Sequence, residues 1–228
     1  MIVTMDGPAG AGKSSLARML AQRLGFAFLD TGAMYRCVTL SCLERRISLE
    51  DAEAIAQVAE SISIVFDGER TLVDDQDVTD RLRTPEVTNA IRPIADNQIV
   101  RKQLVRLQQA WAGSRNVVTE GRDQGTIAFP MAECKIFLTA SPEERAKRRV
   151  AQLEAQGVNA NCDEILAQQT QRDDEDIGRV VGGLKAAPDS IHVHTDGMSE
   201  EEVLKRLEEL VLAKMQPERL NSEASPFS

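Results

Sequence analysis

This 228-residue sequence has few cysteines, no net positive charge and no long apolar run. The net charge is −9, so the chain lacks the global positive field that would hold nucleic acid or an anionic membrane. No apolar run approaches the roughly 18–20 residues that a membrane span requires. The four cysteines form no C-x-x-C pair and have no metal-ligand spacing, so we interpret them as reduced thiols that serve as small apolar residues.

Length and composition limit the architecture. A chain of 228 residues can form one well-buried core with a small inserted lobe, and an apolar fraction of 42% is ordinary for a soluble globular protein. The first predicted strand begins at Ile2, with no basic or apolar leader before it. We therefore expect no secretory signal and a cytoplasmic location.

The run GPAGAGKS, residues 7–14, fits the pattern G-x-x-x-x-G-K-[ST]. A short apolar run at residues 2–5 precedes it, and apolar residues at helical spacing follow it over residues 16–24. Strand, glycine loop and helix in this order place backbone N–H groups around phosphate oxygens at the positive end of a helix. We predict a nucleoside triphosphate site formed by Gly7, Pro8, Ala9, Gly10, Ala11, Gly12, Lys13, Ser14 and Ser15.

Two side chains of this loop carry chemistry. Lys13 supplies a positive charge for the β and γ phosphates of ATP, and the Ser14 hydroxyl can bind Mg²⁺. The guanine-reading tetrapeptide N-K-x-D does not occur, so a GTPase is disfavoured. A small-molecule kinase is the better interpretation of the loop.

Apolar runs alternating with helical patterns predict an α/β protein, a three-layer α/β/α fold around a mostly parallel sheet. Core strands are expected at residues 2–5, 26–30, 116–119, 135–138 and 191–194. Helices are expected at residues 16–24, 32–45, 49–60, 85–111 with a break near Arg92-Pro93, 141–179, and from residue 199 onward. A strand pair at residues 62–73, turning at Asp67-Gly68, interrupts this order and predicts an inserted lobe.

We expect one domain over residues 1–228. Its predicted core comprises residues 1–36, 95–144 and 182–215, with an inserted lobe at 37–94, a lid region at 145–181 and a flexible tail at 216–228.

Arginine recurs at helical spacing in the predicted lid. Arg145, Arg148 and Arg149 fall at i, i+3 and i+4, whereas Arg172, Asp176 and Arg179 share one face if their helix is continuous. One interpretation is a solvated face of intrahelical ion pairs with neighbouring acidic residues. The other is a lid that neutralises a transferring phosphoryl group and excludes water. Because the chain also carries a phosphate-binding loop, we favour the interpretation as a lid.

Two segments are candidates for the acceptor side. In residues 30–36, Thr31 can cap a helix while Tyr35 and Arg36 project from its first turn. In residues 120–126, an apolar strand ends in Gly-Arg-Asp, which places Arg122 and Asp123 at the carboxyl end of a strand, where open α/β sheets bind ligands. Arginine suits a substrate phosphate there, and a buried ion pair is the alternative.

Five segments, GPAGAGKSS, LDTGAMYR, EGRDQGT, KIFLTASPEERAKRR and QRDDEDIGR, resemble in order and separation the bacterial-type cytidylate kinases, a family of P-loop nucleoside monophosphate kinases. The resemblance covers roughly residues 2–215. It implies phosphoryl transfer from ATP to CMP or dCMP with Mg²⁺, in a monomer that binds small nucleotides and neither nucleic acid nor membrane. The inserted lobe is similar to the nucleoside-monophosphate-binding insert of the family.

The resemblance also implies roles for residues at matching positions. Tyr35, Arg36, Arg122 and Arg179 would hold the acceptor phosphate, Arg172 and Asp176 the ribose, and Arg101 and Asp123 the base, with Thr31 in the same binding set. The implied catalytic set is Lys13, Arg122, Arg145, Arg149 and Arg179. No general base is needed, because the attacking group is already a phosphate oxygen anion.

The base assignment also follows from the chemistry of cytosine. Its N4 amino group donates to a carboxylate such as Asp123, and its N3 and O2 accept from an arginine such as Arg101. Uracil would place an acceptor against Asp123, so we predict weak UMP turnover. Asp123→Ala should reduce the CMP preference more than it weakens ATP binding.

Three positions depart from the family pattern: Glu120 replaces an aspartate, Arg92 stands where a serine commonly helps to read the base, and Gly182-Gly183 replaces a proline-containing turn. The alternatives that remain are a kinase for UMP or for a small non-nucleotide acceptor, and a nucleotide-gated switch. His192 and His194 alternate along the last predicted strand without a metal-binding pattern, so we predict a structural or edge role for them.

Overall fold

The structure is a computed structural model that describes residues 1–155 and 157–215. Residue contacts divide the chain into two compact units. The first comprises Met1–Leu29, Ser114–Gly178 and the chain from Gly182 onward, and the second comprises Asp30–Gly113 and Arg179–Val181. The predicted flexible tail, residues 216–228, lies outside the described residues.

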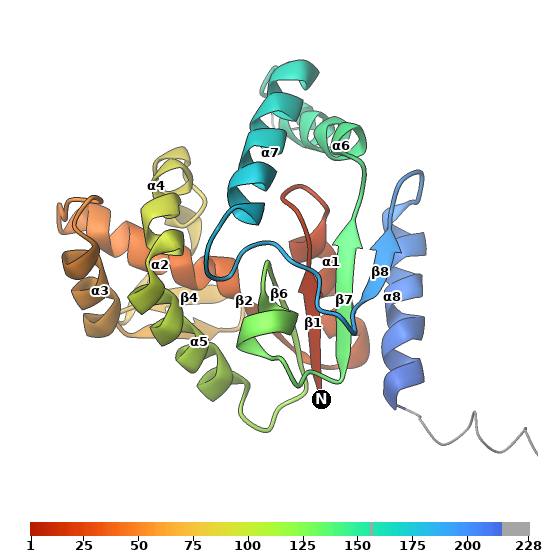
Figure 1. The fold of residues 1–228 in the computed structure, drawn as a ribbon, viewed down its shortest axis with the longest axis horizontal. Coiled ribbons are helices and arrows are strands. Elements are labelled where there is room, and N and C mark those ends of the chain that lie inside the picture. Colours follow the sequence, from red (N-terminus) through yellow and green to blue (C-terminus); the bar gives the residue numbers. More distant parts are fainter. Residues whose placement is uncertain (156, 216–228) are drawn as a thin grey trace, which may run out of the picture. The chain divides into compact units, whose positions relative to one another are not determined.

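The first unit is built on a five-stranded sheet in the order β2-β6-β1-β7-β8, with β1 at its centre (Figure 1). Its strands are β1 (Ile2–Asp6), β2 (Ala27–Asp30), β6 (Val117–Gly121), β7 (Cys134–Thr139) and β8 (Ile191–His194). Its helices are α1 (Lys13–Leu24), α6 (Pro142–Ala155), α7 (Cys162–Ile177) and α8 (Glu200–Met215), with a short π-helical turn, η2 (Gln124–Ala128). β1 pairs in parallel with β6 and β7, and β7 pairs in parallel with β8. The predicted α/β class with a central parallel sheet flanked by helices is confirmed.

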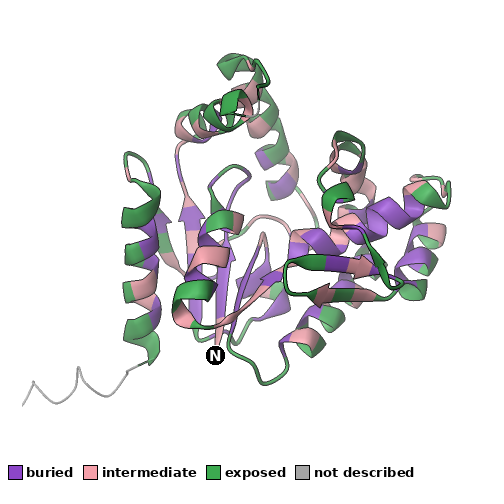
Figure 2. Ribbon diagram, turned by 180° about the vertical axis from the view of Figure 1, so that it is seen from behind, coloured by how far each residue is buried: buried purple, intermediate pink, exposed green. Residues whose placement is uncertain are grey.

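Successive side chains of β1 point alternately into the apolar core and toward the opposite face of the sheet. Val3 and Met5 are fully buried in an apolar cluster to which Leu20 of α1 and Leu207 of α8 also belong. Because successive side chains of a strand point to opposite faces, Thr4 and Asp6 face the other side of the sheet. Figure 2 shows the strands of this sheet mostly in purple, which marks them as buried. A buried carboxylate, Asp6, thus ends a strand that is otherwise shielded from water.

The predicted helical stretch over residues 141–179 is not one continuous helix. The segment forms two helices, and α7 starts anew because the side chain of Asn161 caps it by accepting from the backbone N–H groups of Asp163 and Glu164. α7 then ends at Ile177, so Arg179 lies beyond it. Arg179 therefore does not continue the helical face of Arg172 and Asp176.

The second unit is mainly helical and carries a small antiparallel sheet in the order β3-β4-β5. Its elements are α2 (Thr31–Glu44), α3 (Ala52–Ser61), β3 (Ile64–Asp67), β4 (Arg70–Val73), β5 (Gln76–Asp77), the 3₁₀ turn η1 (Thr79–Arg81), α4 (Pro85–Asp96) and α5 (Gln98–Ala112). This unit contains more residues than the predicted lobe at residues 37–94. It also includes α5, which contacts α2, α3 and α4.

The predicted helix break near Arg92-Pro93 is also misplaced. Pro93 lies inside α4, and the break comes at Asn97, whose side chain accepts from the N–H groups of Ile99 and Val100 and so caps α5. A strong capping side chain, rather than the proline, decides where the second helix begins.

Candidate active site

The phosphate loop has the predicted setting between β1 and α1. Gly7 adopts a φ of 152°, and a Cβ atom at this position would lie 2.0 Å from the carbonyl oxygen of Leu138 on β7. The loop backbone therefore passes so close to β7 that only glycine fits. Gly12, with a φ of 84°, caps the helix that Lys13 opens.

Lys13 is held inside this loop. Its side chain is 5% exposed, and its Nζ donates to the carbonyl oxygen of Pro8 at 2.7 Å. Burial, and after it the positive charge of Arg122, lower the pKa of Lys13 to about 7 against the opposing effect of Glu120. An anionic ligand would restore the charge of Lys13, because it would supply the counter-charge that burial withholds.

Ser14 and Glu120 bring two oxygen ligands together. The Ser14 hydroxyl donates to Oε1 of Glu120 at 3.0 Å, and Glu120 comes from the end of β6. The longer side chain of Glu120 therefore reaches the loop. Within residues 1–155 and 157–215, no three His, Cys, Asp or Glu side chains gather as a metal cage. A pair of oxygens next to a phosphate site fits Mg²⁺, which usually binds one or two protein oxygens together with substrate phosphates.

Asp6 joins the phosphate loop to the segment that follows β6. Its Oδ1 accepts from the N–H of Gln124 at 2.8 Å, and its Oδ2 accepts from the N–H of Gly125 at 2.7 Å. Burial raises the pKa of Asp6 to about 6, although both backbone hydrogen bonds act in the opposite direction. Asp6 is not among the site residues predicted from the sequence. Its signal was a carboxylate that closes an apolar strand directly before the glycine loop.

Arg122 and Asp176 form an ion pair in the first unit. The Nε of Arg122 lies 2.7 Å from Oδ2 of Asp176, and Asp176 is buried on α7. The structure thus brings together two residues that the sequence assigned to the phosphate and to the ribose of the acceptor. Asp123, the next residue along from Arg122, is also buried, whereas Arg172 is exposed.

Arg145 links α6 and α7 to the phosphate loop. Its side chain is 4% exposed, and its Nη1 donates to the carbonyl oxygen of Ala9 at 2.8 Å and lies 2.6 Å from Oδ2 of Asp173. The other carboxylate oxygen of Asp173 accepts from the N–H of Ala9 at 3.3 Å. A simple solvated face does not describe Arg145, because its partners lie on the loop and on the neighbouring helix.

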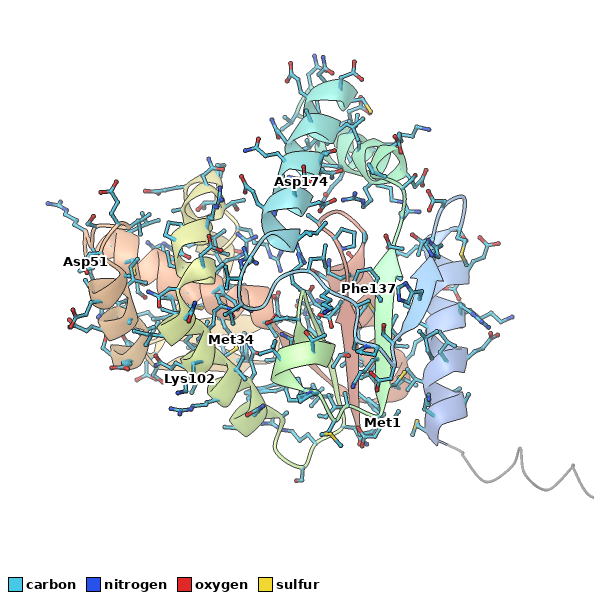
Figure 3. All side chains as sticks on the ribbon, viewed as in Figure 1. Met1, Met34, Asp51, Lys102, Phe137 and Asp174 are labelled. Atoms are coloured by element: carbon cyan, nitrogen blue, oxygen red, sulfur yellow. The ribbon has the colours of Figure 1, made fainter. Side chains whose placement is uncertain are left out.

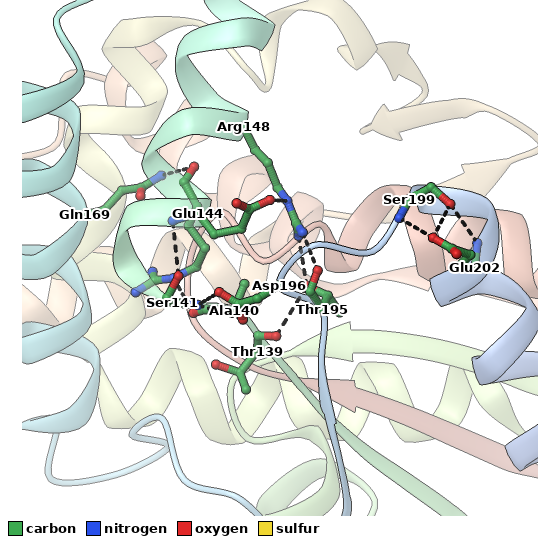
Figure 4. Close-up of polar contacts among 11 residues, drawn as sticks. Thr139, Ala140, Ser141, Glu144, Arg148, Gln169, Thr195, Asp196, Ser199 and Glu202 are labelled. Carbon is green, nitrogen blue, oxygen red and sulfur yellow. Dashed lines mark hydrogen bonds and ion pairs between the residues drawn. The ribbon is translucent and has the colours of Figure 1, made fainter.

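The three arginines of α6 take separate directions. Arg148 pairs with Glu144 and donates to the hydroxyl and the carbonyl oxygen of Thr195, which ties α6 to the chain after β8 (Figure 4). Arg149 is exposed and donates to Gln152 one turn further along. The structure therefore brings Arg145, and neither of the others, to the phosphate loop.

The second unit holds the remaining predicted acceptor residues. Arg101 is buried, donates to the carbonyl oxygen of Ala95 and lies over the ring of Tyr35, with 5.6 Å between its guanidinium carbon and the ring centre. Arg36 donates to the hydroxyl of Thr88 at 3.0 Å. These contacts place three of the predicted acceptor residues on α2 and α5 of a single unit.

The predicted cap of α2 is wrong. Thr31 is the buried first residue of the helix, and the cap is Asp30, whose Oδ1 accepts from the N–H of Ala33 at 2.9 Å. The carboxylate outcompetes the hydroxyl at this position, and it also pairs with Arg83 at 2.7 Å. Arg83 is not among the residues predicted from the sequence.

Arg179 and Arg92 share a carboxylate. The Nε of Arg179 lies 2.6 Å from Asp96, and the Nε of Arg92 lies 3.5 Å from the same side chain. The departure at Arg92 thus adds a positive charge next to the ion pair of a predicted phosphate ligand.

Both histidines lie on β8, an edge strand of the large sheet. The ring of His192 packs on Phe137 of β7, with 5.2 Å between the ring centres, and Figure 3 labels Phe137 on its strand. Both histidine side chains are exposed. Their position is the edge position that the sequence predicted.

A glycine loop between a central parallel strand and a helix, with a buried lysine and an oxygen pair beside it, defines a P-loop phosphate-binding protein. A family model described as cytidylate kinase matches residues 3–213. The chain belongs to the cytidylate kinase family. Within residues 1–155 and 157–215, no helix combines the length and the apolar character needed to cross a membrane.

Curated relatives match over nearly their whole length. A cytidylate kinase from Rhodopirellula baltica is 50% identical over 225 residues, which are 99% of this chain and 98% of the relative. A cytidylate kinase from Carboxydothermus hydrogenoformans is 44% identical over 215 residues, 92% of this chain and 97% of the relative.

Solved structures support the fold at much lower identity. A crystal structure from Thermus thermophilus covers 94% of this chain and 97% of its own, with a TM-score of 0.51 and 18% identity. An uncharacterized protein from Eubacterium ventriosum covers 93% and 99%, with a TM-score of 0.52 and 11% identity.

Proposed function

We propose that this protein transfers the γ-phosphoryl group of ATP to CMP and dCMP, giving ADP with CDP or dCDP. The observation that carries the proposal is the joint placement of Lys13, the Ser14–Glu120 pair and Arg122 at one end of the parallel sheet. Membership of the cytidylate kinase family supports the choice of acceptor. We further propose a cytoplasmic monomer that binds neither nucleic acid nor membrane, in keeping with the net charge of −9.

The phosphate loop would bind the donor. Residues 7–15 present backbone N–H groups at the start of α1, and Lys13 would move from the carbonyl oxygen of Pro8 to the β and γ phosphates. Arg145 stands beside the loop through its bond to Ala9 and would neutralise charge at the γ phosphate. Arg149 remains a proposed catalytic residue that would have to leave Gln152.

Ser14 and Glu120 would hold Mg²⁺, Ser14 through its hydroxyl and Glu120 through the carboxylate that now accepts from it. When bound there, Mg²⁺ would neutralise negative charge on the phosphates. The protein's contribution is to keep the two oxygens 3.0 Å apart at the ends of β6 and of the loop.

The acceptor residues are divided between the two units. Arg122, Asp123, Arg172 and Asp176 belong to the first, and Thr31, Tyr35, Arg36, Arg101 and Arg179 to the second. We propose that residues 37–94 act as the nucleoside-monophosphate-binding lobe and residues 145–181 as the lid. Arg122 and Arg179 would exchange the carboxylates of Asp176 and Asp96 for the phosphate of CMP.

The transfer needs positioning and charge neutralisation rather than a base. A phosphate oxygen of CMP forms a bond to the γ phosphorus of ATP while the bond from that phosphorus to the β–γ bridging oxygen breaks, and the electron pair leaves with ADP. Lys13 and the arginines compensate the negative charge on the transferring group.

The role of Asp123 in base reading has its own test. Asp123→Ala should lower the ratio of kcat/KM for CMP to that for UMP by about 10- to 100-fold, because it removes the acceptor for the N4 amino group of cytosine. Steady-state rates with each nucleotide, and the KM for ATP, measure it. Equal losses for CMP and UMP would refute the role.

A coupled assay of ADP formation tests the function. CMP, dCMP, UMP, AMP, GMP and shikimate are offered in turn with ATP and Mg²⁺. We expect fast ADP formation with CMP and dCMP and slow formation with the others. ADP formation that no added nucleotide accelerates would refute the proposal, and turnover of UMP alone would refute only the base assignment.

A further inference from the structure

We propose that Asp6 is a positioning residue that sets the selectivity of the acceptor site by fixing the Arg122–Asp123 segment to the phosphate loop. This inference rests on the proposed function. Asp6 is 3% exposed, ends β1 and directly precedes Gly7. It is not one of the residues expected to touch either nucleotide.

The first observation is the chain geometry. Asp6 is in register with Gly121 of β6 and Phe137 of β7, so it lies at the sheet end where the phosphate loop and the segment after β6 both begin. Gly7 fixes the loop against the backbone of β7. The pairing of β1 with its two neighbouring strands therefore fixes the position of Asp6.

The second observation is what the carboxylate holds. Both of its oxygens accept from successive backbone N–H groups, those of Gln124 and Gly125, at 2.8 and 2.7 Å. These two residues open η2, and the carbonyl oxygen of Asp123 closes the same turn by accepting from Ile127 at 2.8 Å. One carboxylate thus fixes the two residues that immediately follow Asp123.

The third observation is that the surroundings leave the segment little freedom. A Cβ atom at Gly125 would lie 3.0 Å from the Thr4 hydroxyl and 3.3 Å from Asp6 Oδ2, so the backbone packs directly on this face of β1. The side chain of Gln124 is buried and accepts from the Thr119 hydroxyl at 3.0 Å. Asp6 of β1 and Thr119 of β6 therefore hold the turn from two neighbouring strands.

Energetics point to positioning rather than to stability. Burial of the Asp6 carboxylate raises its pKa, so above about pH 6 the folded protein carries an ionised group that burial penalises. The charged groups that act on Asp6 are Lys13, which favours ionisation, and Asp123, which opposes it. The compensation is that the ionised carboxylate accepts two oriented hydrogen bonds from backbone N–H groups.

Asp6→Asn tests the inference because it keeps the size and replaces one acceptor oxygen with an N–H₂ donor. That donor would face an N–H of Gln124 or Gly125 and displace the turn. Since small displacements of substrate-positioning groups cost up to about 100-fold, we expect kcat/KM for CMP to fall about 10- to 100-fold, mainly through KM. We also expect the CMP-to-UMP ratio to fall about tenfold while the KM for ATP stays within about twofold.

Glu133→Gln is the matched control. Glu133 also accepts a backbone N–H, that of Ile2 at 2.7 Å, but Ile2 lies at the opposite end of β1 from Asp6. We expect its kinetics to match those of the wild type. Circular dichroism and thermal melting confirm that each variant is folded.

Gly125→Ala decides the question if Asp6→Asn does not fold. The added methyl group pushes the turn away from Asp6 without changing any charge, and we expect the same loss of CMP selectivity. A folded Asp6→Asn or Gly125→Ala with wild-type KM for CMP and wild-type selectivity would overturn the inference. So would a rise confined to the KM for ATP, which would assign Asp6 to the phosphate loop alone. Failure of the proposed function is distinct, since the wild-type protein itself would then show no CMP-dependent ADP formation.

Discussion

The phosphate loop and helix α7 both hold cationic side chains, but they hold them differently. In the loop, Lys13 donates to a backbone carbonyl of the loop itself. On α7, Asp173 and Asp176 hold Arg145 and Arg122 through carboxylates. The backbone of the loop thus holds Lys13 in place. On α7, carboxylates pair with arginines that would otherwise pair with the phosphates of a nucleotide. Nucleotide binding would therefore take Lys13 from a backbone carbonyl, and it would take Arg145 and Arg122 from the carboxylates of α7.

Such an exchange avoids a large penalty. Removing one partner of a buried ion pair costs about 3–5 kcal/mol, because the remaining charge stays buried without compensation. A phosphate that replaces Asp173 beside Arg145 supplies new compensation as the old one leaves. Arg145, at 4% exposure, would therefore have an anionic partner throughout.

The largest expected effect is on the loop side. Lys13→Met should lower kcat about 10²- to 10³-fold, because it removes the positive charge that Lys13 would place at the γ phosphate. Rates of ADP formation at saturating CMP measure the loss. Lys147→Met is the control, since Lys147 is exposed on α6, and it should leave the rate unchanged. A loss below tenfold for Lys13→Met would show that the loop acts through its backbone alone.

A smaller effect of opposite sign is expected on α7. Asp173→Asn should lower the KM for ATP about threefold to tenfold, because the amide competes less well than a carboxylate for Arg145 and the Ala9 N–H. The same variant should melt at a lower temperature, because a buried ion pair is broken. Asp174→Asn is the neighbouring control, as Asp174 is exposed. A higher KM for ATP would mean that Asp173 supports the site and does not occupy it.

The smallest expected signal is a proton. The folded, ligand-free protein has a Lys13 pKa of about 7, so at pH 8 most of this amine is neutral. ATP would raise that pKa, and the protein should take up about one proton per ATP at pH 8 and less as the pH falls below 7. Calorimetry in two buffers of different ionisation enthalpy measures the uptake. Lys13→Met should abolish it, and uptake that persists in this variant would assign the proton elsewhere.

The loop and the sheet were predictable because their signals are local. The glycine pattern of residues 7–14 and the apolar runs of the five strands each specify structure within a few neighbouring residues. Family resemblance then supplied the acceptor residues, whose roles stay predictions.

The remaining contacts were not predictable because they join distant segments. Asp6 meets Gln124 across a sequence separation of 118 residues, and Ala9 meets Asp173 across 164. Helical spacing also could not show that Asn161 would start a second helix, which removed Arg179 from the face of Arg172. The helical period of a sequence identifies residues that are neighbours within one helix. It does not show where one helix ends and a capping residue begins another.

The exposed thiol of Cys162 in the first turn of α7 gives experimental access to this helix. Burial raises the pKa of Cys37 to about 12 and those of Cys42 and Cys134 to about 11, so these three thiols react slowly with alkylating reagents. A maleimide fluorophore should therefore attach to Cys162 without any engineered cysteine. Its emission during a titration with ATP would then follow, in the natural sequence, the helix that carries Asp173 and Asp176.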